Sequence, residues 1–211
     1  YTFGTKFNIS NSIFLNCQNI NSEGVLYFAE QSLEENILDN VSCLNTTATG
    51  GSCFFSYNTQ TFVNRLTINS SIASKKNLFY IFSITETIQL QMSNTIIDKS
   101  ISKESSIEFR NAFIKFDNIT IKNSVFAIQM VNLIRCQLNI NNLFLSNSPN
   151  PSSNGLDKMI KISLSYGNIN NLNLLGDFST SGIYIEASNP LIFNNTIIQN
   201  MNSFLQVGSA F

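Results

Sequence analysis

An asparagine that recurs at a nearly constant spacing is the feature that most limits what this chain can fold into. Taking the first Asn of the segment NITIKN (118–123) as position zero, similar segments occur eight times, separated by 29, 24, 30, 24, 24, 29 and 24 residues. The first asparagines are Asn11, Asn40, Asn64, Asn94, Asn118, Asn142, Asn171 and Asn195. A unit of 24 residues with occasional longer loops explains every interval, and such a period indicates a repeat architecture.

Apolar and polar residues alternate around each of these asparagines. The residue two positions earlier is always apolar, and the residue immediately before is mostly polar. The residue three positions later is apolar in every unit except one, where it is Thr67. This alternation is typical of half-buried strands. Asn suits a sharp bend between two strands, because it tolerates the left-handed backbone conformation and its amide can bond nearby backbone.

A third apolar stretch follows in each unit after a variable polar segment. These stretches lie at 25–28, 53–55, 78–82, 107–109, 127–131, 159–162, 183–185 and 204–207. Three short strands per turn, about eight coils of 24–30 residues and Asn at the bends predict an all-β fold, a right-handed parallel β-helix. A leucine-rich-repeat solenoid, with a period of about 20–29 residues, is the alternative, although no segment here is patterned as its helix.

Asparagines at the same position of successive coils can bond amide to amide. We therefore expect the eight first asparagines to form a structural ladder along the stack. We expect this ladder to face inward, which would hide Asn40 and Asn118 from modification.

The composition limits the class of partner. The chain is 43% hydrophobic and 12% charged with a net charge of −1, so no basic surface for nucleic acid is expected. No apolar run reaches the roughly 18 residues that a membrane-spanning helix needs. The sequence starts at Tyr1 and stops at Phe211 within an apolar pattern. We therefore expect residues 1–211 to be a single β-helix segment that continues into further coils or stacks end to end with copies of itself.

The four cysteines are spaced unlike a zinc site, and the chain contains no His. We therefore expect no metal and no cofactor. Cys43 and Cys53 bracket a short loop and are candidates for a disulfide, as is Cys17 with either of them. Small buried thiols are an equally good interpretation of these residues and of Cys136.

The coils, the three strands and the Asn bends resemble the pectate-lyase-like superfamily of right-handed parallel β-helices over residues 7–207. The Asn- and Ile-rich, Gly-poor coils look most like the very large surface β-helix proteins of ciliated protists. Lyases of the superfamily hold Ca²⁺ with clustered Asp and use Arg or Lys as the base, and its hydrolases use clustered Asp and commonly His. This chain has only five scattered Asp and no His, so we expect no enzyme.

The stack of third strands is where proteins of this fold usually contact carbohydrate. Placing Ile107, Phe109, Ile183 and Ile185 inward leaves alternate residues facing outward. The candidates for a carbohydrate or partner face are Tyr27, Glu108, Arg110, Gln129, Lys161, Tyr184, Glu186 and Gln206. Phe54 and Tyr80 belong either to this face or to the core.

Six N-x-S/T sequons occur, at Asn8, Asn40, Asn45, Asn69, Asn118 and Asn194. Asn8 and Asn194 are expected on outward positions, and Asn45 and Asn69 open variable loops, so these four are the glycosylation candidates. We therefore predict an extracellular or cell-surface glycoprotein that builds a rod, fibre or coat. A carbohydrate-binding or adhesin module is the alternative function, and a polysaccharide lyase or hydrolase is the third.

Overall fold

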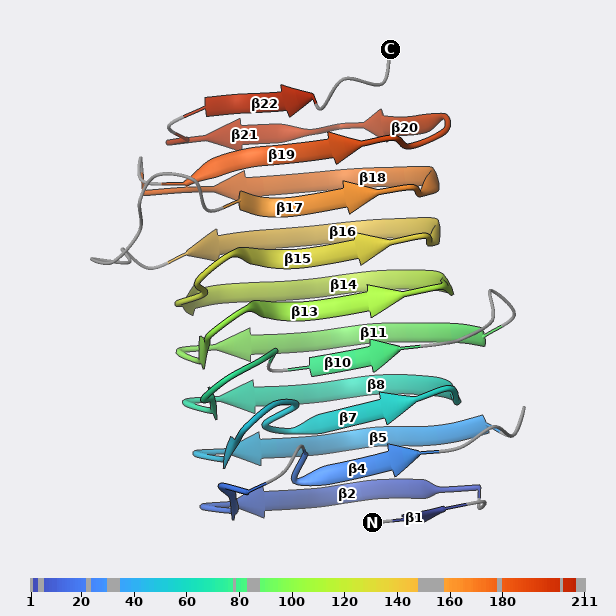
Figure 1. The fold of residues 1–211 in the computed structure, drawn as a ribbon, viewed down its shortest axis with the longest axis vertical. Coiled ribbons are helices and arrows are strands. Elements are labelled where there is room, and N and C mark those ends of the chain that lie inside the picture. The colour runs from blue at the N-terminus through green and yellow to red at the C-terminus, as the bar shows by residue number, and fades with distance from the viewer. Residues whose placement is uncertain are drawn as a thin grey trace.

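The computed structural model describes residues 2–3, 6–21, 24–29, 35–77, 79–82, 88–147, 158–177, 180–201 and 203–207. Every regular element in these ranges is a strand, and the strands stack into a parallel β-solenoid (Figure 1). The nearer strands in Figure 1 run to the right and the farther strands run back to the left as the chain climbs, so the coil is right-handed. No described residue is helical, which is not the pattern of a leucine-rich repeat.

Sheet A forms the nearer side of the stack and contains nine parallel strands. They are β1 (Thr2–Phe3), β4 (Leu26–Ala29), β7 (Phe54–Tyr57), β10 (Phe79–Phe82), β13 (Ser105–Arg110), β15 (Gln129–Ile134), β17 (Lys158–Ser163), β19 (Ser181–Glu186) and β22 (Ser203–Val207). Apart from β1, these strands overlap the predicted third apolar stretches. Phe54 faces the core and is fully buried, so its alternative assignment to the outer face is wrong.

Sheet B forms the farther side and contains the repeated asparagines. Its strands are β2 (Asn8–Leu15), β5 (Glu35–Leu44), β8 (Gln60–Asn69), β11 (Ile88–Asp98), β14 (Ala112–Ser124), β16 (Gln137–Asn147), β18 (Tyr166–Leu175), β20 (Leu191–Asn194) and β21 (Ile197–Gln199). Except in the last coil, the two strands predicted on either side of each Asn form one long strand that bends at a single residue. Sheet C is small, with β3 (Gln18–Asn19), β6 (Thr47–Ala48), β9 (Ile72–Ala73) and β12 (Ile101–Ser102).

The solenoid makes about six turns, slightly fewer than the eight predicted. The strands of the two end coils are present but incompletely enclosed. Inward residues such as Leu38 in β5 and Leu172 in β18 are buried, whereas Phe14 in β2 and Phe193 in β20 remain half-buried. A coil with a neighbour on only one side cannot cover its apolar residues completely.

The bend of each long strand is a residue with a positive φ angle, as the Asn pattern predicted. In the third coil, however, this residue is Arg65 (φ 54°), not Asn64. The pairing confirms the shift, because Asn64 lies opposite Asp39 and Ser93, which both precede a bend. Counting from Arg65, the residue three positions later is Ile68, which is buried. The polar exception at Thr67 was therefore an error of alignment by one residue.

Two further left-handed corners occur in most coils. One lies five residues after the bend, at Asn16, Asn45, Ser70, Lys99, Asn123 and Asn200. The other lies between sheets A and B, at Asn58, Asn111, Arg135, Leu164 and Ala187. The first of these corners is mostly an Asn, the residue that also ends the segment NITIKN at Asn123, whereas the corner between sheets A and B has no such sequence pattern.

The core between the sheets is continuous along the stack. Phe54 stacks on Phe79 of the next coil with ring centroids 5.0 Å apart, and Phe79 meets Phe109 edge to face at 5.9 Å. Aliphatic residues of sheet B, including Leu90 and Ile114, are fully buried against this aromatic stack. Burial of apolar area, at roughly 25 cal/mol per Å², is the main stabilising contribution that holds the two sheets together.

Candidate functional site

The outer face of sheet A brings most of the predicted carbohydrate-face residues into one column. The register aligns Tyr27, Phe55, Tyr80, Glu108, Asn132, Lys161, Tyr184 and Gln206 on successive strands. The side chains of Tyr27, Tyr80 and Gln206 lie outside the described part of the structure. Gln129 belongs to a different column, in which it pairs with Lys158. The sequence pattern did not select Asn132, although it occupies the middle of the column.

The N-terminal end of this column is covered by a loop. Phe55 is only 6% exposed although it points away from the core. Gly51, with a φ of 56°, lies so close that a Cβ atom there would be 2.9 Å from Phe55 Cβ. Glycine permits both the left-handed conformation and this approach. The loop therefore closes this end of the sheet A face.

Glu108 is the centre of a polar network in the middle of the column. Its side chain is almost completely buried, and its carboxylate receives hydrogen bonds from Arg110 Nε at 2.6 Å and from Asn132 Nδ2 at 3.0 Å. Asn132 Oδ1 is buried and has no hydrogen-bond partner among the described residues. Glu108 and Gln129 were predicted on an exposed face, but both are buried, so neither is accessible as predicted.

A second carboxylate, Glu104, is electrostatically coupled to this network. Its partial burial, followed by the nearby negative charge of Glu108, raises the pKa of Glu104, and Lys76 and Arg110 oppose the shift. Two neighbouring carboxylates with different environments are a feature of acid–base sites.

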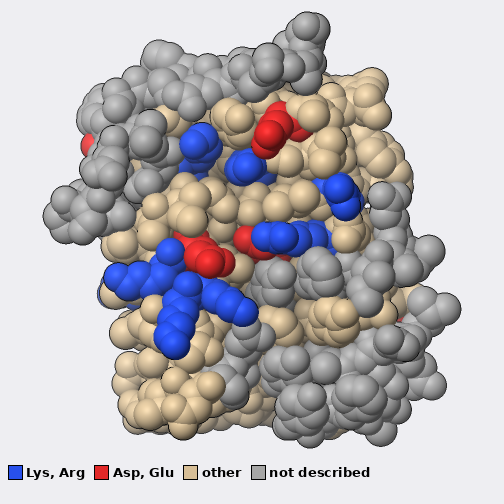
Figure 2. Space-filling model, viewed as in Figure 1, with Lys and Arg blue, Asp and Glu red and all other residues tan. Residues whose placement is uncertain are grey.

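Tyr184 is the centre of a partly exposed group on this face. The ammonium groups of Lys158 and Lys161 lie 5.1 Å and 5.7 Å from the centre of its ring. Glu186 Oε2 lies 3.4 Å from Lys161 Nζ and accepts a hydrogen bond from Ser163 Oγ at 3.2 Å. Figure 2 shows the basic and acidic side chains gathered in adjacent groups on this face. Two ammonium groups and one carboxylate leave this group with a net positive charge.

The predicted Asn ladder is present, but it faces solvent and not the core. Asn118 Nδ2 donates to Asn94 Oδ1 at 2.9 Å, and Asn171 Nδ2 donates to Asn142 Oδ1 at 3.0 Å. Asn11, Asn40, Asn94, Asn118, Asn142, Asn171 and Asn195 are all exposed, and Asn64 is half-buried. The inward-facing ladder was therefore a wrong prediction.

The ladder is interrupted where a carboxylate replaces an amide as acceptor. Asn64 Nδ2 donates to Asp39 Oδ1, and Asn142 Nδ2 donates to Asp117 Oδ1. Each of these Asp residues directly precedes the bend of its own strand. Asp39 also receives two hydrogen bonds from the Arg65 guanidinium. The hydrogen bond from Arg65 is the main reason why the pKa of Asp39 is lowered.

The glycosylation candidates differ in how freely they present their amides. Asn8 is exposed, and its amide makes no hydrogen bond with the described residues. Asn194 and Asn45 are exposed but donate to Asn170 and Asn16 in the preceding coil. Asn69 is half-buried and accepts a hydrogen bond from Ser70.

The two excluded sequons, Asn40 and Asn118, are exposed as well. Burial is therefore not a reason to exclude them, although each amide is engaged in the ladder.

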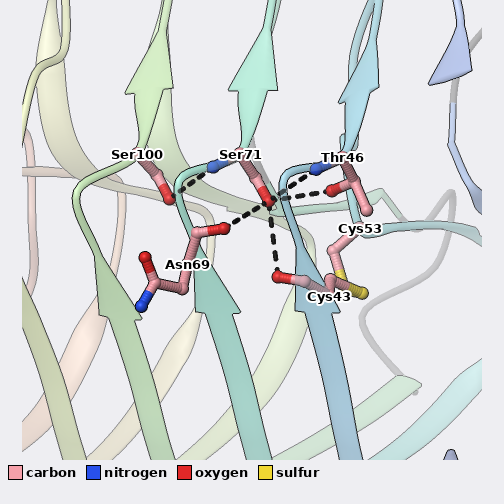
Figure 3. The surroundings of a disulfide bond; sticks show 6 residues. All are labelled: Cys43, Thr46, Cys53, Asn69, Ser71 and Ser100. Carbon is pink, nitrogen blue, oxygen red and sulfur yellow. Dashed lines mark hydrogen bonds between the residues drawn. A yellow bond between two sulfur atoms is a disulfide. The ribbon is translucent and has the colours of Figure 1, made fainter. Parts of the chain in front are cut away.

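A buried ladder of hydroxyl groups is the structural feature that sequence reasoning missed. Ser71 Oγ accepts hydrogen bonds from the backbone N–H and the hydroxyl of Thr46, and Ser100 Oγ accepts from the Ser71 N–H (Figure 3). Ser124 continues the ladder in the next coil. All four residues are buried and directly follow a left-handed corner. A Ser, Thr or Cys after the corners at Asn16, Asn45, Ser70, Lys99 and Asn123 was the sequence signal.

The disulfide between Cys43 and Cys53 lies beside this ladder. The two Cα atoms are 5.6 Å apart, and Ser71 Oγ contacts the carbonyl oxygen of Cys43 (Figure 3). The bond tethers the loop that covers Phe55. Cys17 and Cys136 are free thiols, so the alternative pairings with Cys17 are not formed.

Comparisons of the chain with protein-family models, curated proteins and solved structures find no match. Within the described residues, no group of three or more His, Cys, Asp or Glu is arranged to hold a metal ion. The same residues include no helix long and apolar enough to cross a membrane.

Proposed function

We propose that this chain is a structural β-solenoid segment that builds a rod, fibre or coat outside the cell or at its surface. One observation carries the proposal: the outward amides of sheet B bond mainly to the next coil. The ladder bonds join side chains 24–30 residues apart in sequence, along the axis of the stack. Side chains used in this way stiffen the solenoid and leave few groups free for chemistry.

The open edges of the end coils support assembly along the same axis. The outer edge of β2 has no strand paired to it among the described residues, and its inward residues Ile9 and Phe14 are only half-buried. A further coil, from the same chain or another copy, would pair with this edge and cover these residues. We further propose that the chain belongs to the pectate-lyase-like superfamily but lacks its catalytic residues. Within that superfamily, we propose that it is related to the large surface β-helix proteins of ciliated protists.

Electron microscopy of the purified chain tests assembly directly. We expect rods whose length increases with protein concentration, with a fibre-diffraction spacing of about 4.8 Å along the axis. Replacing Ile13 by Lys is a suitable control, because Ile13 is 69% exposed on the outer face and should not affect stacking. Replacing Ile9 by Lys should shorten the rods. Monodisperse monomers at high concentration would contradict the proposal.

N-linked glycans form the second part of the proposal, and secretion from a eukaryotic host tests it. Asn8 is the best-supported site, because its amide is exposed and makes no bond within the described structure. Peptide mapping after treatment with a glycosidase should show Asn8 modified, and Ser10→Ala should remove that modification. A secreted, folded chain without any glycan would contradict an extracellular glycoprotein.

A carbohydrate-binding or adhesin module is the second candidate, and the group around Tyr184 favours it. Lys158 and Lys161 beside an aromatic ring match an anionic sugar better than a neutral one. Binding of a sulfated or uronate oligosaccharide that is lost in Tyr184→Ala, and weakened by salt, would support this function.

A further inference from the structure

A groove crosses the outer face of sheet B in the first four long strands. Its volume is about 340 Å³, and it is lined by residues of β2, β5, β8 and β11. This volume lies near the lower end of the range of small-molecule sites, about 300–1,000 Å³. The groove lies on sheet B, whereas the predicted carbohydrate face lies on sheet A.

The floor of the groove is an apolar pair with an amide at each end. Ile37 and Phe62 are paired neighbours on adjacent strands, and both are half-buried. Asn8 pairs with Ile37 on one side, and Gln91 pairs with Phe62 on the other. In the next three coils the same column holds the polar residues Lys115, Asn139 and Asn168. The apolar floor is therefore local and not a general property of the column.

The wall of the groove is fixed by hydrogen bonds. Asn64 donates to Asp39 at 2.9 Å and accepts from Ser93 Oγ at 3.1 Å. Such a connected network holds its members in place before a ligand arrives. The side chains of Ser10 and Gln91, by contrast, make no hydrogen bond with the described residues. They are therefore available to a ligand.

We propose that this groove binds a short neutral oligosaccharide. A sugar ring presents an apolar C–H face, which fits Ile37 and Phe62, and a rim of hydroxyl groups, which fits the hydroxyl of Ser10 and the amide of Gln91. Asp39 and Arg65 neutralise each other at the wall, so no net charge selects an anionic ligand. An added peptide strand does not fit, because the groove lies on the face of the sheet, where the backbone groups already pair.

The experiment is a binding titration of the full chain with a panel of neutral trisaccharides, namely maltotriose, mannotriose, xylotriose and chitotriose. Calorimetry or saturation-transfer NMR gives the affinity, since the chain has no Trp for fluorescence. We expect at least one of them to bind, and Phe62→Ala to weaken it about tenfold or more. Gln91→Ala removes one hydrogen bond and should weaken binding about fivefold.

Matched controls lie outside the groove. Phe144 is an outward, half-buried residue of β16, and Asn139 occupies the same column as Gln91, so Phe144→Ala and Asn139→Ala should leave the affinity unchanged. If Phe62→Ala does not fold, Phe62→Leu and Gln91→Ala decide the outcome.

No binding by any panel member, or binding unchanged in the groove variants, would overturn the proposal. The oligosaccharide proposal does not depend on rod formation. A monomeric chain that binds an oligosaccharide, with binding weakened by Phe62→Ala, would contradict the rod proposal but support the groove proposal.

Discussion

The buried hydroxyl ladder and the exposed amide ladder connect the same coils but lie in opposite surroundings. Ser71 and Ser100 accept backbone N–H groups that no water can reach, so their hydroxyls complete the hydrogen bonding of the corner. Asn94 and Asn118, in contrast, are exposed to solvent, and their amides bond to Asn side chains of neighbouring coils. The exposed ladder therefore tolerates Arg65 at a bend and carboxylates as acceptors. The buried ladder requires a small hydroxyl.

The largest effect that tests this contrast is expected for Ser71→Ala. The substitution leaves the backbone N–H and hydroxyl of Thr46 without an acceptor in the core, and each unsatisfied buried group costs about 1–3 kcal/mol. We expect the free energy of unfolding to fall by about 2–3 kcal/mol in urea titrations. Ser74→Ala is the control, because Ser74 is exposed and should change stability by less than about 0.5 kcal/mol. Equal losses for both variants would remove the distinction between the ladders.

Loss of one Asn from the exposed ladder should lower the free energy of unfolding by less. Asn94 donates to Asn64 and accepts from Asn118, and its φ angle is 48°. Asn94→Ala loses both the amide and the preference for the left-handed region, for a total of about 1–1.5 kcal/mol. Asn94→Gly keeps the conformation and loses only the amide, so it should lose less than Asn94→Ala in the same titration. A loss of stability as large as that of Ser71→Ala would mean that solvent exposure does not reduce the contribution of an Asn in this ladder.

The direction of the amide ladder could have been predicted from the sequence with one further step. The apolar residues two before and three after the bend are five positions apart, an odd number, yet both face the core. A period of two cannot place both inward unless one residue is added. The left-handed residue is that addition. Asp39 and Asn40 consequently both point outward, and Leu38 and Val41 both point inward.

Other features depend on contacts that alternation alone cannot supply. The period of the asparagines predicted the coils, the strands of sheet A and most of the bends. The burial of Glu108 depends on its partners Arg110 and Asn132 from the same and the next strand, and the cover over Phe55 depends on a loop conformation. The groove requires Ile37 and Phe62 to be neighbours, and the strand register shows that they are. The sequence pattern placed the bend of this strand at Asn64, one residue too early, and so did not align these two residues.

A corner occupied by an unsuitable residue offers a gain in stability. Leu164 has a φ of 52° and is 49% exposed, so it bears the cost of the left-handed conformation without burying its side chain. Leu164→Asn should raise the free energy of unfolding by about 0.5–1 kcal/mol, because Asn adopts this region more readily. Asn111→Leu, at the equivalent corner two coils earlier, should show the opposite change. Unchanged stability in both variants would mean that the residue type at these corners does not affect the free energy of unfolding.

The smallest expected effect is a pH dependence at the charged interruption of the exposed ladder. Arg65 lowers the pKa of Asp39 in the folded chain, so the unfolded chain takes up this proton first as the pH falls. The contribution of this pair is therefore present above the ordinary pKa of Asp, near 3.8, and is lost as the pH falls through the lower folded value. In Asp39→Asn this acid loss should be smaller, as measured by unfolding between pH 5 and pH 2, about the range in which such carboxylates titrate. Both groups are exposed, so screening by about 1 M salt should reduce the difference as well. A buried rung such as Ser100 carries no charge, and its contribution should depend on neither pH nor salt.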